Sequence, residues 1–422
     1  MDVSSERLQA DIETNAEFGA IDTDEGRGRT VLTGSSADRA AREYFVERLE
    51  DAGLTVSVDV IGNIAGRWVP PEADPTAAPV AVGSHLDSVP QGGIFDGPLG
   101  VYGALEAVRA LQESDITLDR PVLVVSWTEE EGIRFDTGLL GSAVAAGVTP
   151  LSEALSLQDD DGITVEAALE DIGFRGADTL DPAGWDAWFE LHVEQGRELE
   201  SAGASVGVVE AISGITNCRV IVSGEANHAG ATQMYQRRDA LAAASQFVLD
   251  VEQAARDVAN TMSESAVGTV GNMAVSPNAN NVVPGEVTLT VDVRDVDRAA
   301  MDRIVDSARA SAARIERDRP VETEFDQYRL TEPSGMAERC VSAVVAAADS
   351  TATDMMRMHS AALHDTANLA EQTDTVLLFA PSRDGISHNP LEWTDWVDCA
   401  TATRVLAGAI ADVAAESAHI PE

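Results

Sequence analysis

The feature that most constrains the fold is a set of short apolar runs without polar alternation, separated by stretches with helical spacing. The runs at 78–84, 121–130 and 373–382 are apolar over most of their length, which is typical of strands buried on both faces of a sheet. Apolar residues recur at helical spacing at 38–54 and 99–112. This alternation predicts an α/β fold with a largely parallel sheet covered on both faces.

The middle of the chain has a different texture. Strands predicted at 216–226 and 286–296 alternate apolar and polar residues, as half-exposed antiparallel strands do. With helices at 237–256 and 298–317 and a strand at 268–275, the order is strand, helix, strand, strand, helix, strand. That order is typical of a small α+β sandwich domain.

The last part of the chain returns to the first texture, with helices predicted at 337–350 and 395–417 around an apolar strand. We therefore predict a discontinuous catalytic domain at 1–211 and 329–422. A lid or dimerisation domain at 212–328 is inserted into it. His419 is expected to lie in a frayed terminal segment.

The charge balance is extreme, with 72 acidic and 28 basic residues and a net charge of −44. All the basic residues are arginines. Such a surface repels itself, and concentrated salt screens that repulsion. The composition resembles that of cytoplasmic proteins of extreme halophiles. It argues against nucleic-acid binding, which needs a basic surface.

Three further features of the sequence bear on the cellular compartment of the protein. No apolar run reaches the roughly 18 residues that a membrane span needs, so no membrane partner is expected. The acidic N-terminal stretch lacks the basic and apolar regions of a signal peptide. The three cysteines are far apart, which is typical of buried thiols in a reducing compartment. These features predict a cytoplasmic protein.

Histidine is the informative residue type, because only seven occur whereas acids are too common for a cluster to mean much. His85, His192 and His388 each follow a predicted buried strand, and three glutamates at 129–131 follow another. In open α/β sheets the ligand crevice lies outside the carboxyl ends of the strands. We therefore expect these side chains to lie together.

These residue types suit a pair of divalent metal ions. Two ions about 3.5–4 Å apart can together activate a water and polarise an amide carbonyl. A carboxylate must bridge them, and Asp96, in the glycine-rich stretch 83–100, is the candidate. Imidazoles and carboxylates suit zinc or manganese. Asp87 is expected to accept the other ring N–H of His85.

Six stretches carry a family resemblance: GSHLDSVPQGGIFDGPLGV, TEEEGIRF, ELHVEQG, ANHAGAT with RRDAL, NVVPGEVTLTVDVRD and SRDGISHNPLEWT. In sequence and order they resemble the hydantoinase/carbamoylase group of zinc amidohydrolases. That group includes N-carbamoyl-L-amino-acid hydrolases, allantoate amidohydrolases and β-ureidopropionases. It belongs to the superfamily of co-catalytic di-zinc carboxypeptidases and aminoacylases.

The resemblance implies a metal site and a base. One ion would be held by His85, Asp96 and His192, and the other by Asp96, Glu131 and His388. Glu130 would be the general base that takes a proton from water and passes it to the leaving nitrogen. The implied cofactors are two Zn²⁺ ions, with Mn²⁺, Co²⁺ or Ni²⁺ as alternatives. The alternative is that Glu130 and Glu131 are solvated surface acids with no role in metal binding or catalysis.

The resemblance also implies substrate contacts. Gln195 would contact the substrate, and Asn281 and Arg294 would hold its carboxylate. His228 would reach a neighbouring subunit's site and stabilise the oxyanion, which implies a homodimer. The alternatives are a loop histidine for His228, a turn residue for Asn281 and, for Arg294, an ion pair with Asp292 or Asp295.

One stretch departs from the family. Where the family has Ser-Gly-Ala-Gly-His-Asp-Ala, this chain has Ser-Ala-Ala-Leu-His-Asp-Thr at 360–366. Ala361 and Leu363 replace glycines, which allow close backbone approach to a ligand. The substrate pocket is therefore expected to differ. His359 and His364 are interpreted as structural.

The expected activity is hydrolysis of a linear amide, namely the ureido group of an N-carbamoyl-L-amino acid, to the L-amino acid, CO2 and NH3. The alternative substrates are allantoate, 3-ureidopropionate, and an N-acyl amino acid or dipeptide. A further alternative is a metal-binding relative that binds a ureido or amino-acid ligand without turnover. Glu130 argues against that alternative, whereas Ala361 and Leu363 argue for it.

Overall fold

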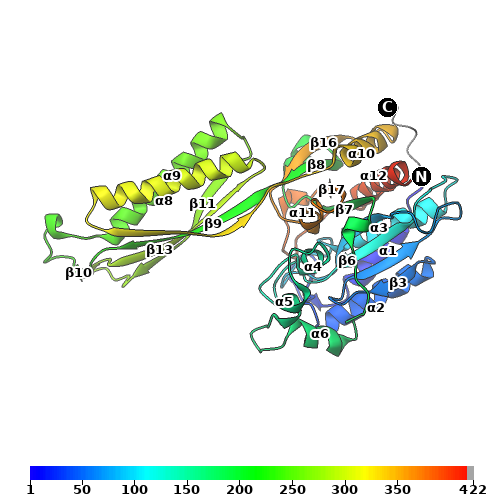
Figure 1. The fold of residues 1–422 in the computed structure, drawn as a ribbon, viewed down its shortest axis with the longest axis horizontal. Coiled ribbons are helices and arrows are strands. Elements are labelled where there is room, and N and C mark those ends of the chain that lie inside the picture. Colours follow the sequence, from blue (N-terminus) through cyan, green and yellow to red (C-terminus); the bar gives the residue numbers. More distant parts are fainter. Residues whose placement is uncertain (416–422) are drawn as a thin grey trace. The chain divides into compact units, whose positions relative to one another are not determined.

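The structure, a computed structural model, describes residues 1–415; His419 lies outside the described residues. Its contacts divide the chain into two compact units (Figure 1). Unit 1 comprises Met1–Glu210, Met336–Met358 and the chain from His364 onward, and unit 2 comprises Ala211–Gly335 and His359–Leu363. The catalytic and lid roles expected of the two domains stay predictions.

The sheet of unit 1 has four parallel strands at its centre. They run in the order β17, β7, β5, β6, and β5, β6 and β7 are buried at every position. Strands β8, β4 and β3 continue the sheet antiparallel at its sides, and β16 pairs with β8. The bounds are β3 Thr55–Val58, β4 Ile64–Trp68, β5 Val80–His85, β6 Val122–Trp127, β7 Ala187–Val193, β8 Val206–Ile212, β16 Met355–Ser360 and β17 Asp374–Ala380. The prediction of a mostly parallel, buried sheet is confirmed.

Strands β3 and β4, at 55–68, form an antiparallel hairpin. Its turn is held by Asp59, whose Oδ1 accepts the N–H groups of Ile61 and Asn63 at 3.0 and 2.8 Å. Gly62 has a φ of 88° in this turn, a conformation that glycine adopts at little cost.

Helices and a tryptophan cluster cover the two faces of this sheet. One face packs on α1, α3 and α12, which share a core with β5 and β7. Ala81, Leu123 and Val125 point the other way and pack with Trp127, Trp185, Trp188 and α11. The helices of unit 1 are α1 Ser5–Asn15, α2 Ser36–Asp51, α3 Pro98–Gln112, α4 Leu140–Ala145, α5 Leu151–Ser156, α6 Val165–Ile172, α7 Glu198–Ala202, α10 Glu338–Ser350, α11 Asp365–Leu369 and α12 Trp396–Ala414. A two-stranded ribbon adds β1 Ala20–Ile21 and β2 Gly28–Arg29.

Unit 2 is an antiparallel sheet with two long helices on one face (Figure 1). The strand order is β11-β13-β9-β14. Along β13 every second residue, beginning with Val287, is buried beneath the helices. The bounds are β9 Gly214–Ser223, β10 Asn227–His228, α8 Ala240–Thr261, β11 Val267–Ser276, β12 Val282–Val283, β13 Glu286–Asp295, α9 Arg298–Asp318, β14 Glu322–Thr331 and β15 Ser334–Gly335. The predicted α+β order is confirmed.

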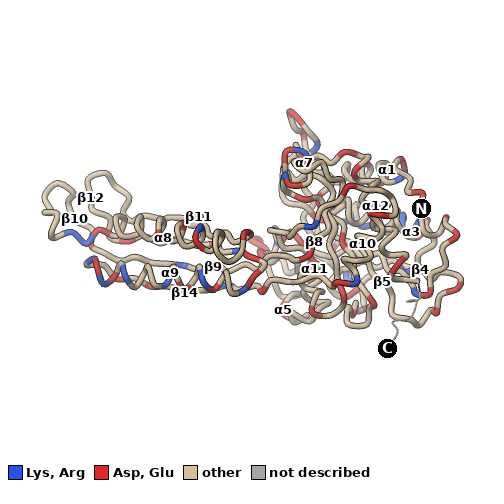
Figure 2. The backbone as a smooth tube through the Cα atoms, turned by 90° about the horizontal axis from the view of Figure 1, so that it is seen from above, with Lys and Arg blue, Asp and Glu red and all other residues tan. Residues whose placement is uncertain are grey.

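Acidic residues occur along the helices and loops of both units, with arginines among them (Figure 2). None of the helices within residues 1–415 has both the length and the apolar character needed to cross a membrane.

Candidate metal centre

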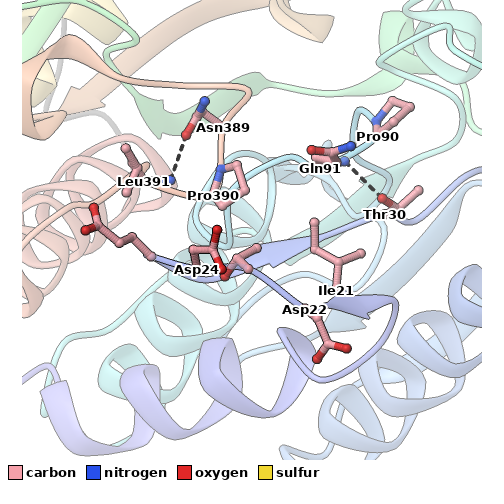
Figure 3. Close-up of a pocket in the computed structure, with 11 residues that line it drawn as sticks. Ile21, Asp22, Asp24, Thr30, Pro90, Gln91, Asn389, Pro390 and Leu391 are labelled. Atoms are coloured by element: carbon pink, nitrogen blue, oxygen red, sulfur yellow. Dashed lines mark hydrogen bonds between the residues drawn. The ribbon is translucent and has the colours of Figure 1, made fainter.

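Unit 1 contains a cavity of about 670 Å³ that is lined by three loops (Figure 3). The loops contribute residues 21–25, Pro90 with Gln91, and residues 389–391. Three of the lining residues are acids and none is a histidine. His85 and His388 lie on neighbouring stretches of two of these loops, and the candidate site is built around them.

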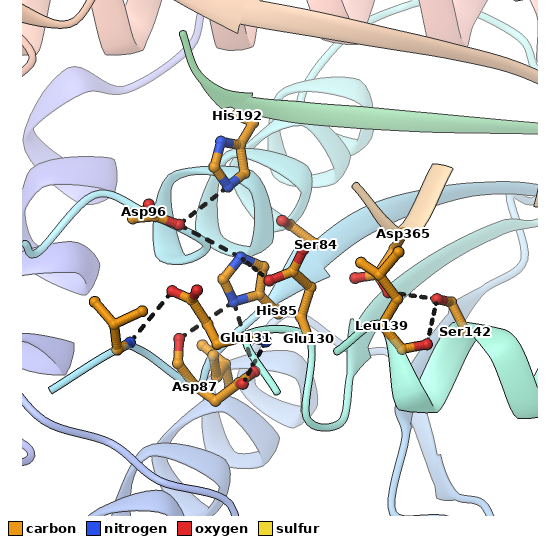
Figure 4. A network of polar contacts seen from close by, with 12 residues as sticks. Ser84, His85, Asp87, Asp96, Glu130, Glu131, Leu139, Ser142, His192 and Asp365 are labelled. Atoms are coloured by element: carbon orange, nitrogen blue, oxygen red, sulfur yellow. Dashed lines mark hydrogen bonds and ion pairs between the residues drawn. The ribbon is translucent and has the colours of Figure 1, made fainter. Parts of the chain in front are cut away.

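The candidate site is formed where β5, β6 and β7 end. His85 is the last residue of β5 and His192 is the penultimate residue of β7. Glu130 and Glu131 lie in the loop that follows β6. Asp96 lies in the loop before α3 and points toward both histidines (Figure 4). The next residue must be small, because a Cβ on Gly97 would lie 2.6 Å from the His85 ring.

Asp96 lies between two groups of candidate metal-ligand atoms. Its Oδ1 is 3.5 Å from Nε2 of His85 and 3.2 Å from Nε2 of His192. Its Oδ2 is 3.3 Å from Nε2 of His388, which is 3.6 Å from Oε2 of Glu131. The structure thus brings together both predicted sets, His85 with Asp96 and His192, and Asp96 with Glu131 and His388.

These donors fit divalent metal ions. Ligand atoms about 2.0–2.1 Å from a tetrahedral zinc lie about 3.3–3.4 Å from one another, close to the separations around Asp96. His192 Nδ1 lies 2.9 Å from the carbonyl oxygen of Val193, so Nε2 is left for an ion. His85 Nε2 is buried and has no hydrogen-bond partner, so its lone pair is available to coordinate a cation.

Asp87 connects two parts of the site. The nearest acceptor to His85 Nδ1 is the main-chain oxygen of Asp87 at 3.2 Å, and the carboxylate Oδ1 is 3.5 Å away. The other carboxylate oxygen accepts the Glu131 N–H at 3.1 Å. Asp87 therefore orients the His85 ring mainly through its backbone, and its side chain holds the glutamate loop.

The pKa values reflect crowded buried charge. Burial, reinforced by the charge of Asp96, raises the pKa of Glu131 to about 7. The hydrogen bond to Asp96 raises the pKa of His388 to about 9. Burial opposes ionisation of Asp96, but the neighbouring histidines outweigh it and hold the pKa well below its usual value. Divalent cations would stabilise the ionised carboxylates.

Glu130 lies in the same cluster, with Oε2 3.7 Å from Nε2 of His85. Burial raises the pKa of this carboxyl well above its ordinary value. A carboxylate with a raised pKa is a stronger proton acceptor. Glu129 does not face the cluster; its Oε1 accepts the N–H groups of Arg134 and Phe135, both at 3.0 Å, and so holds the loop.

Gln195 also reaches the cluster. Its Nε2 donates to Oδ2 of Asp96 at 2.9 Å. Gln195, Glu129 and His388 have φ values of 58°, 53° and 53°. Left-handed backbone in residues other than glycine is costly and tends to gather at functional sites, and here it occurs in three loops of one site.

The other predicted residues lie in unit 2. His228, in β10, is exposed, and its Nδ1 accepts the N–H groups of Gly230 and Ala231, both at 3.0 Å. Asn281 is an exposed turn residue just before β12, and its main-chain carbonyl oxygen accepts the N–H of Ala229. Their proposed roles remain predictions.

Arg294 makes the ion pair considered as its alternative. Its Nε is 2.9 Å from Oδ1 of Asp292. Its Nη1 donates to the carbonyl oxygen of Ala361 at 3.0 Å. The stretch that departs from the family therefore contacts the arginine expected to hold the substrate carboxylate.

Sequence reasoning missed several supporting residues. The fully buried Glu190 accepts the hydroxyl of Ser84 at 3.0 Å and the N–H of Thr366 at 3.1 Å. The buried Arg29 donates to the carbonyl oxygen of Leu86 at 3.0 Å. The His364 ring packs edge-on against His192, with centroids 4.6 Å apart. In so acidic a chain no pattern distinguishes Glu190 from surface acids. His364 was not missed, because it was interpreted as structural, which its packing on His192 agrees with.

Known proteins resemble the chain over nearly its whole length. Residues 81–412 match Peptidase family M20/M25/M40. The N-carbamoyl-L-amino-acid amidohydrolase of Paenarthrobacter aurescens is 36% identical over 95% of this chain and 96% of its own. The ureidoglycolate hydrolase of Oryza sativa subsp. japonica is 34% identical over 97% and 84%. A crystal structure of an amidase of the hydantoinase/carbamoylase family from Burkholderia multivorans matches with a TM-score of 0.91, at 37% identity over 98% of both chains.

Proposed function

The chain belongs to Peptidase family M20/M25/M40 and to its hydantoinase/carbamoylase group, and from this we propose that it is a metal-dependent amidohydrolase. Its substrates would be N-carbamoyl-L-amino acids, hydrolysed with one water to the L-amino acid, CO2 and NH3. The observation that carries the proposal is the meeting of Glu130 with the two donor sets around Asp96.

The proposed metal site holds two ions. His85, Asp96 and His192 would bind one, and Asp96, Glu131 and His388 the other. Zinc is the proposed metal, and the same donors accept Mn²⁺, Co²⁺ or Ni²⁺. When bound, such ions lower the pKa of a water and polarise the carbonyl.

Glu130 would move the proton in this reaction. Its carboxylate, buried beside His85, takes a proton from the attacking water and returns it to the leaving nitrogen. Gln195 would orient the substrate, since its amide lies 2.9 Å from the bridging Asp96. Asp87 and Glu129 would hold the loop that carries Glu130.

Unit 2 would supply the remaining contacts. Arg294 and Asn281 would bind the substrate carboxylate, with Asp292 fixing the guanidinium. His228 would act on the oxyanion in a neighbouring subunit of a homodimer. Its exposure in the β10 hairpin leaves the ring accessible to another chain.

The charge supports a halophilic, cytoplasmic enzyme. The net charge is −44, and all three cysteines are free and buried, as in a reducing compartment. Lowering salt from 1 M to 0.1 M lengthens the screening distance from about 3 to about 10 Å. The acidic chain should then unfold or separate its subunits. Circular dichroism that stays constant over this range would contradict the halophile proposal.

Other substrates remain as alternatives: allantoate or ureidoglycolate-type compounds, 3-ureidopropionate, N-acyl amino acids and dipeptides. The ureidoglycolate hydrolase among the relatives favours the first of these. The non-enzyme alternative is a metal-binding relative that binds a ureido or amino-acid ligand without turnover. The buried Glu130 argues against this alternative.

The test is ammonia release from a panel of these compounds, before and after metal removal by a chelator. N-carbamoyl-L-amino acids should be turned over with metal and not without it. Preference for an allantoate-type compound would change the substrate, whereas metal binding without any turnover would favour the binding protein.

A further inference from the structure

We propose that Glu392 is a positioning residue that builds the second ion site, by fixing Asp96 and His388 relative to each other. The inference rests on the proposed metal-dependent function. Glu392 is buried and lies four residues after His388. Its carboxylate contacts both the loop that carries Asp96 and the loop that carries His388.

One oxygen of Glu392 holds the Asp96 loop. Its Oε1 accepts the backbone N–H groups of Phe95 and Asp96, both at 3.0 Å. The fit is close, because a Cβ on Gly93 would lie 2.2 Å from this oxygen. The backbone of the bridging carboxylate is thus set by a side chain that lies nearly 300 residues later in the sequence.

The other oxygen holds the His388 loop. The Ser387 hydroxyl lies 2.9 Å from Oε2 of Glu392 and 2.8 Å from Oδ2 of Asp96. Oδ2 is the oxygen of Asp96 that faces His388. One serine, adjacent in sequence to a proposed ligand, therefore joins Glu392 to the bridging carboxylate.

The first ion site depends less on this support, although it shares Asp96. His85 and His192 are buried and belong to neighbouring parallel strands. His388 instead lies in a loop, with 49% of its side chain exposed. Its backbone is in the left-handed region, where a histidine is not held by its own preference.

Packing supports these loops on one side. The Phe95 ring contacts that of Trp393 at a centroid distance of 5.3 Å. On the other side, residues 90–91 and 389–391 line the cavity of about 670 Å³ (Figure 3). The hydrogen bonds of Glu392 and Ser387 connect the same two loops.

The test is metal binding by the metal-free protein. Zn²⁺ or Co²⁺ is titrated by calorimetry into the parent, Glu392→Ala and Ser387→Ala, and the Co²⁺ absorption spectrum is recorded. Losing a supporting hydrogen bond around a metal typically costs about 10–100-fold in affinity. We expect that loss for the second ion in Glu392→Ala and a smaller loss of the same ion in Ser387→Ala. The first ion, which shares Asp96 but is also held by two strand-borne histidines, should lose less affinity than the second in both variants.

Two controls separate positioning from general stability. Glu392→Gln keeps an oxygen for the two N–H groups and an amide that can donate to Ser387, so it should restore most of the affinity. Glu106→Gln alters another fully buried glutamate, paired with Arg7, and should lower stability without changing either ion.

Each outcome decides the proposal. Two ions bound with parental affinity by Glu392→Ala, or equal weakening of both ions, would overturn it. If Glu392→Ala does not fold, the selective loss in Ser387→Ala must carry it, and an unchanged second ion there would overturn it. A parent that binds both ions but hydrolyses no compound of the panel would refute the proposed function alone.

Discussion

The two units place their chemical residues in opposite ways. In unit 1 the clustered histidines and acids are mostly buried and lie at the ends of strands that are buried on both faces. In unit 2 the sheet has one face under helices, and His228 and Asn281 lie exposed on turns and short strands.

This difference separates two kinds of site. Residues at the common edge of a parallel sheet meet without help from another chain, so unit 1 assembles its donors by itself. Exposed residues on an antiparallel sheet need a partner surface to become a site. We therefore expect substitutions in unit 1 to affect metal or chemistry, and those in unit 2 to affect substrate and assembly.

The largest effect should come from Glu130→Gln in unit 1. Removing the proton acceptor should lower kcat by about 10²–10⁴-fold, because water then loses its base. Metal content should stay parental, since Glu130 is not assigned to either ion. Steady-state kinetics together with metal analysis test this. Near-parental turnover would show that another group is the base.

A smaller effect is expected from Arg294→Ala in unit 2. Hydrogen bonds to charged groups contribute about 1.5–3 kcal/mol, so kcat/KM should fall by about 10- to 100-fold, mainly through KM. Both ions should still bind. Arg298→Ala, at another arginine paired with an acid, is the matched control and should keep parental kinetics. An unchanged KM in Arg294→Ala would mean that Arg294 does not bind the substrate and only forms the ion pair with Asp292.

Leu363→Gly tests the stretch that departs from the family. If the isobutyl group restricts the pocket, its removal should raise kcat/KM for bulky N-carbamoyl amino acids by about tenfold, the scale of a pocket contact of about 1–3 kcal/mol. Small substrates should gain less. The ratio of the two specificity constants is the measurement, and an unchanged ratio would mean that Leu363 only packs within its unit.

The last prediction tests whether unit 2 acts across subunits. Glu130→Gln and His228→Ala proteins, each inactive, are unfolded together and refolded. When equal amounts of the two variants pair at random, half of all dimers are hybrids, and each hybrid has one intact site out of two. About a quarter of the parental activity should therefore return. Hybrids that form without activity would show that His228 works within its own chain, and the contrast between the units would fail.

The sequence alone determined the fold class and the donors at the strand ends. The buried runs had no alternation, so only a doubly covered sheet could hold them. Histidine is rare here, so His85, His192 and His388 stood out against 72 acids. Both signals are local, and the topology of a parallel sheet converts them into proximity.

Only the tertiary structure decided which of the many acids support the site. Glu190 and Glu392 follow no local pattern that separates them from surface glutamates, because burial and partners come from segments far away in sequence. The turn that splits 55–68 into two strands was likewise decided by the hydrogen bonds of Asp59. A hydrogen bond between distant segments exists only once the chain has folded, and it is therefore invisible to periodicity and spacing.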